Sequence, residues 1–71
     1  MFDTWTALDS TSIQAIQYDE TTKVLQIRFA RGSEYQYEGV PADVVTGLAH
    51  ASSPGRYFRA NIAGAYGDEG V

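Results

Sequence analysis

Apolar and polar residues alternate along two neighbouring stretches near the middle of the chain. Leu25, Ile27 and Phe29 are separated by polar residues, the period of two that is typical of a strand with one buried face and one solvated face. A second alternation runs through residues 34–38 and ends at Gly39. The pattern predicts a β-hairpin around which the rest of the chain packs.

The turn between these strands decides which face its two tyrosines occupy. Gly32 fits the last position of a three-residue loop, because that position takes a left-handed backbone conformation. Such a loop pairs Ile27 with Tyr35 and Leu25 with Tyr37, so both tyrosines join the apolar face. We therefore expect Tyr35 and Tyr37 to contribute to the core.

The same register pairs Arg28 with Glu34 on the solvated face, where opposite charges stabilise the hairpin by roughly a few tenths of a kcal/mol. A slip of one residue would turn Tyr35 and Tyr37 to the side of Arg28, because strand periodicity leaves no intermediate arrangement. The alternative to a tyrosine core is therefore an aromatic and basic platform.

Another strand is expected before the hairpin. Ile16 and Tyr18 share one face of it, whereas Ile13 falls on the other, so a β-bulge between Ile13 and Ile16 is needed to bring all three inward. A four-residue loop after Tyr18 would pair Ile16 with Leu25. A three-stranded antiparallel meander results.

The period changes to that of helices after the sheet. Pro41 suits a helix start, where its missing N–H costs nothing. Val44, Leu48 and Ala51 form one stripe, flanked by a further valine, that we expect to lie on the sheet. Gly47 interrupts this helix, which suggests the close approach of another backbone.

A short second helix is predicted from Pro54 to about Ile62. Phe58 and Ile62 are four residues apart and face inward. Arg56 and Arg59 are three residues apart and share a neighbouring stripe. The helix therefore has an apolar face and a basic one.

These elements predict an α+β fold, a three-stranded antiparallel β-meander packed against two short C-terminal helices. Residues 1–10 are expected to be a flexible N-terminal arm, 11–66 the domain, and 67–71 a frayed acidic tail. Trp5 is expected to dock on the domain as a lid, and the alternative role is to stack on a ligand.

Composition narrows the class of protein. The 71 residues allow one domain with a modest core, which homodimerisation would support. No cysteine is present and no apolar run approaches the roughly 20 residues of a membrane span, so we expect a cytoplasmic protein. The net charge of -4 argues against a large phosphate-binding surface, although the five basic residues can still cluster locally.

The sequence contains no recognisable catalytic motif. His50 is the only histidine, and no nucleophile or orienting carboxylate is placed beside it by a recognisable motif. Gly32 belongs to the predicted hairpin turn and not to a phosphate-binding loop. We therefore expect a non-enzyme without a metal or cofactor, and an uncharacterised hydrolase-like enzyme remains the least favoured alternative.

The order of several motifs resembles the KTSC domain, a family named for the C-terminus of some lysyl-tRNA synthetases. The resemblance covers about residues 10–66 and rests on Ser12-Ile13, Tyr18-Asp19, Leu25, Phe29, Gly32, Tyr35-x-Tyr37, Val40-Pro41, Ala51-x-Ser53, Gly55-x-Tyr57-Phe58, Ile62 and Tyr66. It implies a free-standing form of a domain whose function is not established and for which RNA binding has been suggested. The family often carries a basic residue where this chain has Ala63, which weakens that suggestion.

Two functional classes follow. The first is a non-catalytic interaction module or accessory protein that binds a macromolecular partner, for which a protein is the favoured choice. The second is an RNA-binding module in which Arg28, Arg56, Tyr57 and Arg59 form a local basic and aromatic surface. Charge clustering distinguishes them, because arginines on different faces cannot form one nucleic-acid groove.

Overall fold

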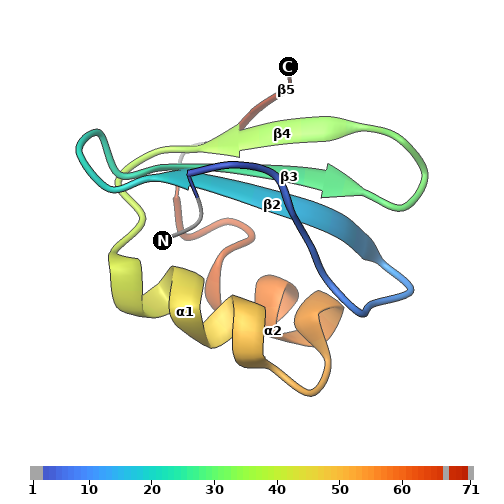
Figure 1. The fold of residues 1–71 in the computed structure, drawn as a ribbon. Helices are drawn as coiled ribbons and strands as arrows, with labels where there is room; N and C mark the ends of the chain where they lie inside the picture. Colours follow the sequence, from blue (N-terminus) through green and yellow to red (C-terminus); the bar gives the residue numbers. More distant parts are fainter. Residues whose placement is uncertain (1–2, 67, 71) are drawn as a thin grey trace.

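The computed structural model describes residues 3–66 and 68–70. The elements in chain order are β1 (Thr6–Ala7), β2 (Ile13–Asp19), β3 (Val24–Phe29), β4 (Glu34–Tyr37), α1 (Ala42–His50), α2 (Pro54–Asn61) and β5 (Asp68–Gly70). The strands form one antiparallel sheet in the order β1-β2-β3-β4-β5, and both helices lie on the same face of it (Figure 1). Within the described ranges, neither helix has the length and apolar character needed to cross a membrane.

The predicted α+β class and the meander of β2, β3 and β4 are confirmed, but the predicted strand number of three is wrong. β1 extends one edge of the sheet by pairing Thr6 with Ile16, and β5 extends the other by pairing Asp68 with Tyr37. Strands of two or three residues carry too short an alternation to be recognised in a sequence. The sheet is consequently wider than predicted.

Both terminal segments thus contribute to the sheet. The predicted arm, residues 1–10, contains β1, and the predicted tail, residues 67–71, contains β5. Residues 1, 2, 67 and 71 lie outside the described residues. The domain boundaries and the mobility of these two segments stay predictions, because strand pairing does not measure motion.

The register of the β3-β4 hairpin is confirmed. Ile27 pairs with Tyr35, as the three-residue loop requires. The Phe29 N–H donates to the Ser33 carbonyl oxygen at 2.8 Å and closes that loop. Gly32 has a φ of 102°, a backbone conformation that side-chain-bearing residues rarely adopt.

The predicted register of β2 against β3 is wrong. Ile16 pairs with Ile27 and not with Leu25, because β2 continues to Asp19 and the loop ends at Lys23, which takes a φ of 59°. The Asp19 carboxylate also accepts hydrogen bonds from two backbone N–H groups of this loop. Since the shift is an even number of residues, every side chain keeps its predicted face.

The predicted β-bulge is confirmed, because the register shifts between Ile13 and Ala15. The bulge lets Ile13, Ile16 and Tyr18 all reach the core, where each is at most 2% exposed. Ala15 is left on the opposite face of the sheet, where it pairs with Arg28. This opposite face, which we call the outer face, is the one that the helices do not cover (Figure 1).

The core lies between the sheet and the two helices. Its buried side chains are Ile13, Ile16, Tyr18, Leu25, Ile27, Tyr37, Val40, Val45, Leu48 and Ile62. Tyr37 pairs with Leu25, as predicted, and its ring meets that of Phe58 edge-on at a centroid distance of 5.5 Å. The tyrosine platform that a one-residue slip would build is therefore excluded.

Two details of the packing of α1 differ from the prediction. Val45 and Leu48 are fully buried, whereas Val44 is only half-buried, so the face on the sheet is rotated toward Val45. Gly47 makes room for the side chain of Tyr57 and not for another backbone, because a β-carbon at Gly47 would overlap the tyrosine hydroxyl. The missing side chain of Gly47 is therefore what lets Tyr57 pack between the helices.

The helix starts agree with the prediction. Pro41 immediately precedes α1 and Pro54 opens α2. Ile62 ends α2 with its side chain buried, and Phe58 lies half-buried one turn earlier. The sequence motif residues on α2 thus hold it against the sheet.

Candidate functional site

Polar residues form ordered rows on the outer face of the sheet. Gln17 of β2 pairs with Gln26 of β3, which pairs with Gln36 of β4. We call these three residues the glutamine row. The next position along the row, in β5, is Glu69. Since paired residues on neighbouring strands have β-carbons about 5 Å apart, the row brings three side-chain amides together across three strands.

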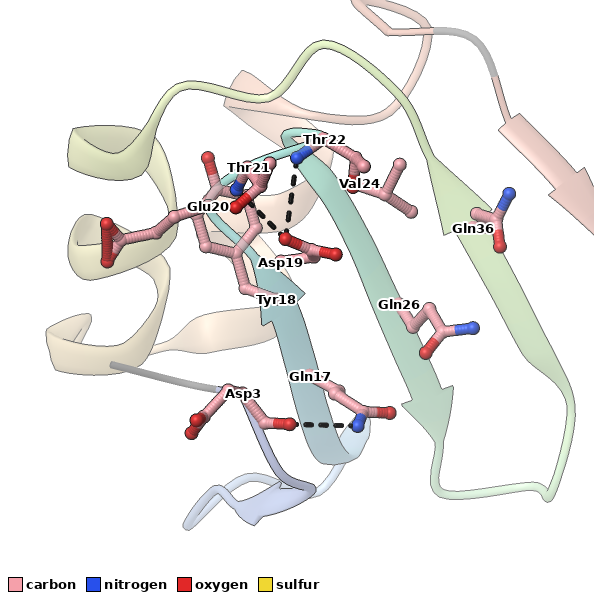
Figure 2. Close-up of a pocket in the computed structure, with 10 residues that line it drawn as sticks. All are labelled: Asp3, Gln17, Tyr18, Asp19, Glu20, Thr21, Thr22, Val24, Gln26 and Gln36. Carbon is pink, nitrogen blue, oxygen red and sulfur yellow. Dashed lines mark hydrogen bonds between the residues drawn. The ribbon is translucent and has the colours of Figure 1, made fainter.

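A hollow of about 670 Å³ lies over this row. We call it the outer-face hollow; it is lined by Asp3, Gln17, Tyr18, Asp19, Glu20, Thr21, Thr22, Val24, Gln26 and Gln36, which Figure 2 draws. Its charged lining residues are Asp3, Asp19 and Glu20, all exposed acids, among the residues that the structure describes. The hollow therefore combines neutral amides with negative charge.

Hydrogen bonds hold two sides of the outer-face hollow (Figure 2). Asp19 Oδ1 accepts from the backbone N–H of Thr21 at 2.9 Å and of Thr22 at 3.4 Å. Gln17 Nε2 donates to the backbone carbonyl of Asp3 at 3.1 Å and ties the N-terminal segment to β2. Asp19 Oδ1 is thus committed to the turn, whereas its second oxygen accepts no hydrogen bond in the described part of the chain.

Arg28 lies on the outer face beside the glutamine row, and its charge is already engaged. Its Nε donates to Glu34 Oε2 at 2.7 Å, which confirms the predicted pairing of these two residues. Its guanidinium carbon also lies 4.3 Å from the centroid of the Trp5 ring. Trp5 therefore packs on a cation, where a lid on apolar surface was expected.

Arg56 and Arg59 lie elsewhere. Both are exposed on α2, three residues apart, on the side of the sheet that carries the helices. Arg28 pairs with Glu34 and alternates along β3 with the buried Ile27, so its side chain lies on the outer face and the structure does not bring the three arginines together. A continuous groove of Arg28, Arg56 and Arg59 is therefore not formed.

Tyr57 is half-buried between the two helices. Its hydroxyl end packs on Gly47 of α1, and its ring belongs to the layer that surrounds the core. Only part of this ring is accessible for stacking on a base. The structure therefore places Tyr57 beside the exposed arginines as a packing residue.

The remaining motif residues have structural positions. Phe29 meets Tyr35 edge-on at 6.0 Å between ring centroids and Phe58 at 5.3 Å. Tyr37 and Ile62 are buried at 3% and 0% exposure. These residues join the hairpin to α2 and have a packing role in this structure.

The hydroxyl of Tyr18 has an altered acidity. Burial raises the pKa of its hydroxyl above the ordinary value of 10.0, and the carboxylates of Glu20, Asp19 and Asp43 raise it further. The hydroxyl donates to the Val40 carbonyl oxygen at 2.6 Å. Tyr18 therefore stays neutral and serves as an anchor between β2 and the start of α1.

His50, the histidine considered from the sequence, is exposed at the end of α1. Among the side chains of residues 3–66, no three or more acidic or histidine groups gather in a way that could hold a metal ion.

Sequence reasoning did not identify the glutamine row, although its signal is present. Gln17, Gln26 and Gln36 each occupy a solvated position of an alternating strand. Their alignment depends on the register of β2, which the sequence prediction placed two residues away along β3. A correct loop after β2 would have placed the three residues side by side.

Comparison with a solved structure supports the fold. The chain superposes on the crystal structure of a KTSC domain protein from Yersinia pestis with a TM-score of 0.89, covering 96% of both chains at 32% sequence identity.

Relatives in sequence are of two kinds. An uncharacterized protein of Stutzerimonas stutzeri is 42% identical over 52 residues, which cover 73% of each chain. A lysine–tRNA ligase of Nostoc is 41% identical over 54 residues, which cover 76% of this chain but only 10% of the ligase. The chain therefore corresponds to about a tenth of that enzyme. The family model of the KTSC domain matches residues 9–66, and the chain belongs to the KTSC domain family.

Proposed function

We propose that this chain is a non-catalytic interaction module that binds a protein partner through the outer face of its sheet. The observation that carries the proposal is the uneven coverage of the sheet. Both helices pack on one face (Figure 1), whereas the other presents the outer-face hollow and the glutamine row (Figure 2). A concave surface on which several polar groups converge is a candidate binding site.

The chemistry of the glutamine row supports a protein partner. A glutamine amide offers two donor hydrogens and an accepting oxygen, which match the N–H and C=O groups of a polypeptide backbone. Gln26 and Gln36 form no side-chain hydrogen bond to another residue in the described part of the chain. Their amides are therefore available to a partner at little cost in broken contacts.

The alternative function is RNA binding through α2. It is supported by the exposed pair Arg56 and Arg59, and by the relatedness of the domain to part of lysine–tRNA ligases. The net charge of -4 and the separation of Arg28 from this pair oppose it. We therefore rank it second.

A capture experiment with matched variants distinguishes the two functions. The immobilised chain, Gln26→Lys and the double variant Arg56→Gln/Arg59→Gln are each incubated with cell lysate, with and without nuclease. We expect the wild type to retain one or more proteins after nuclease treatment. Gln26→Lys should lose these proteins, and the double variant should still retain them.

Other outcomes identify the alternatives. Retention that nuclease abolishes and that the double arginine variant lacks would establish the RNA function instead. Equal retention by the wild type and Gln26→Lys would contradict binding at the outer face.

A further inference from the structure

We infer that the outer-face hollow binds a basic, extended polypeptide segment, with a lysine or arginine side chain placed against Asp19. This inference rests on the proposed function and names the chemistry of the partner. Three properties of the hollow carry it: the sign of its charge, the alignment of its amides and the apolar part of its lining.

The charged residues that line the hollow, Asp3, Asp19 and Glu20, are all acidic. Lys23 lies between the lining residues Thr22 and Val24, but its side chain is exposed and forms no ion pair with these acids in the described part of the chain. Arg28, further along β3, is held by Glu34 at 2.7 Å and by the ring of Trp5. An incoming cation therefore meets carboxylates without competition from that arginine, and complementary charge accelerates encounter and selects the partner.

The alignment of the glutamine row suits an extended segment. Gln17, Gln26 and Gln36 occupy consecutive strands, which lie about 4.8 Å apart, so the row extends across the strands and not along them. A polypeptide in extended conformation exposes backbone N–H and C=O groups along its whole length and turns alternate side chains to one side. Laid along the row, it offers hydrogen-bonding groups to the amides and alternate side chains to the hollow.

Part of the lining is apolar. Val24 is half-buried and lies next to Asp19, its partner in the β2-β3 pairing. Lysine and arginine place their methylene stems on apolar surface while keeping the charged group in a polar setting. Val24 can therefore contact the methylene stem of a lysine or arginine, and Asp19 can contact its charged group.

The test uses defined peptides and the whole chain. Two fluorescein-labelled peptides of equal length, one of alternating lysine and threonine and one of alternating glutamate and threonine, are titrated with the protein at low salt. We expect binding of the lysine peptide, with an affinity that falls as salt is added, and no binding of the glutamate peptide. Equal binding of both peptides, or binding of neither at millimolar protein, would overturn the inference.

Matched variants locate the site. Asp19→Asn removes the charge but keeps the oxygen that accepts from the turn, whereas Asp9→Asn makes the same change at an exposed residue outside the hollow. We expect Asp19→Asn to lower the affinity for the lysine peptide by about two- to fivefold, the range for one charge pair near the surface. Asp9→Asn should leave the affinity unchanged, and an equal loss in both variants would show attraction by net charge alone and overturn the site.

A further variant is expected to change the affinity more than Asp19→Asn does. Gln26→Lys places a cation in the centre of the glutamine row and should lower the affinity for the lysine peptide by on the order of tenfold. Unchanged affinity in this variant would also overturn the inference. If the lysine peptide fails to bind while the protein partner captured from lysate is still lost in Gln26→Lys, the proposed function stands and only its basic partner is wrong.

Discussion

The guanidinium carbon of Arg28 lies 4.3 Å from the centroid of the Trp5 ring, which fastens the N-terminal segment to the outer face of the sheet. Glu34, the residue that pairs with Arg28 on the neighbouring strand β4, accepts a hydrogen bond from the same guanidinium. The contact gives Trp5 a role as a cap on a cation, and Arg28 is engaged by both residues.

Trp5→Ala should lower the free energy of unfolding by about 0.5–1 kcal/mol, the range of a partly exposed cation–π contact. The change is measured by urea unfolding followed by circular dichroism. The same substitution in an Arg28→Gln background should cost less, because the cation is already absent. An equal cost in both backgrounds would show that the contact of Trp5 with Arg28 contributes nothing.

Tyr37→Ala should lower stability by about 3 kcal/mol, because it leaves a cavity beside Leu25 and Phe58 in the core. That is a large part of the roughly 5 kcal/mol margin of a small domain. Tyr37→Phe keeps the ring and should cost much less. Thermal melting compares the three proteins, and a wild-type midpoint for the alanine variant would contradict the described core.

Gly47→Ala should destabilise the domain although alanine favours a helix by about 1 kcal/mol over glycine. The new β-carbon would overlap the Tyr57 hydroxyl and lie 2.7 Å from its Cζ, so the ring must move. In a Tyr57→Ala background the clash is absent and Gly47→Ala should become stabilising. Urea unfolding of the four proteins tests this change of sign; the same sign in both backgrounds would argue against the packing of Tyr57 on Gly47.

Tyr18→Phe should change how stability depends on alkaline pH. Because the folded pKa of Tyr18 is raised, the folded state holds its proton more tightly than the unfolded chain does. That contribution is fully present below pH 10, the unfolded value, and is lost as the pH rises through the folded pKa. The wild type should therefore lose stability above pH 10 more steeply than Tyr18→Phe does.

At neutral pH the wild type and Tyr18→Phe differ in stability for a different reason. Tyr18→Phe removes the hydrogen bond to the Val40 carbonyl and should be less stable by about 1 kcal/mol. The two stability curves should then approach each other above pH 10. Parallel curves from pH 7 to pH 11 would contradict a raised pKa of Tyr18 in the folded state.

The β3-β4 hairpin shows which features a sequence can specify. The alternation around Ile27 and the position of Gly32 fix both the turn and the register, since a three-residue loop admits one pairing. The loop after β2 carried no such constraint. Its end at Lys23 depends on a positive φ that lysine adopts rarely, so the pattern favoured a shorter strand.

The candidate site required long-range information. The outer-face hollow depends on the alignment of Gln17 with Gln26, on the tie between Gln17 and the N-terminal segment, and on the coverage of one face by both helices. None of these is local in sequence. Arg56 and Arg59 were predictable as neighbours because the helical repeat is local, whereas their separation from Arg28 follows only from the packing of layers.

The most direct measurement of the central claim is a nuclear magnetic resonance titration of the isotope-labelled chain with the lysine–threonine peptide. Glutamine side-chain amide signals report on the glutamine row without any substitution. We predict shifts of the Gln17, Gln26 and Gln36 side-chain amides that saturate with peptide, and little change at Arg56 and Arg59. Shifts confined to α2, with the glutamine row unchanged, would contradict binding at the outer face of the sheet.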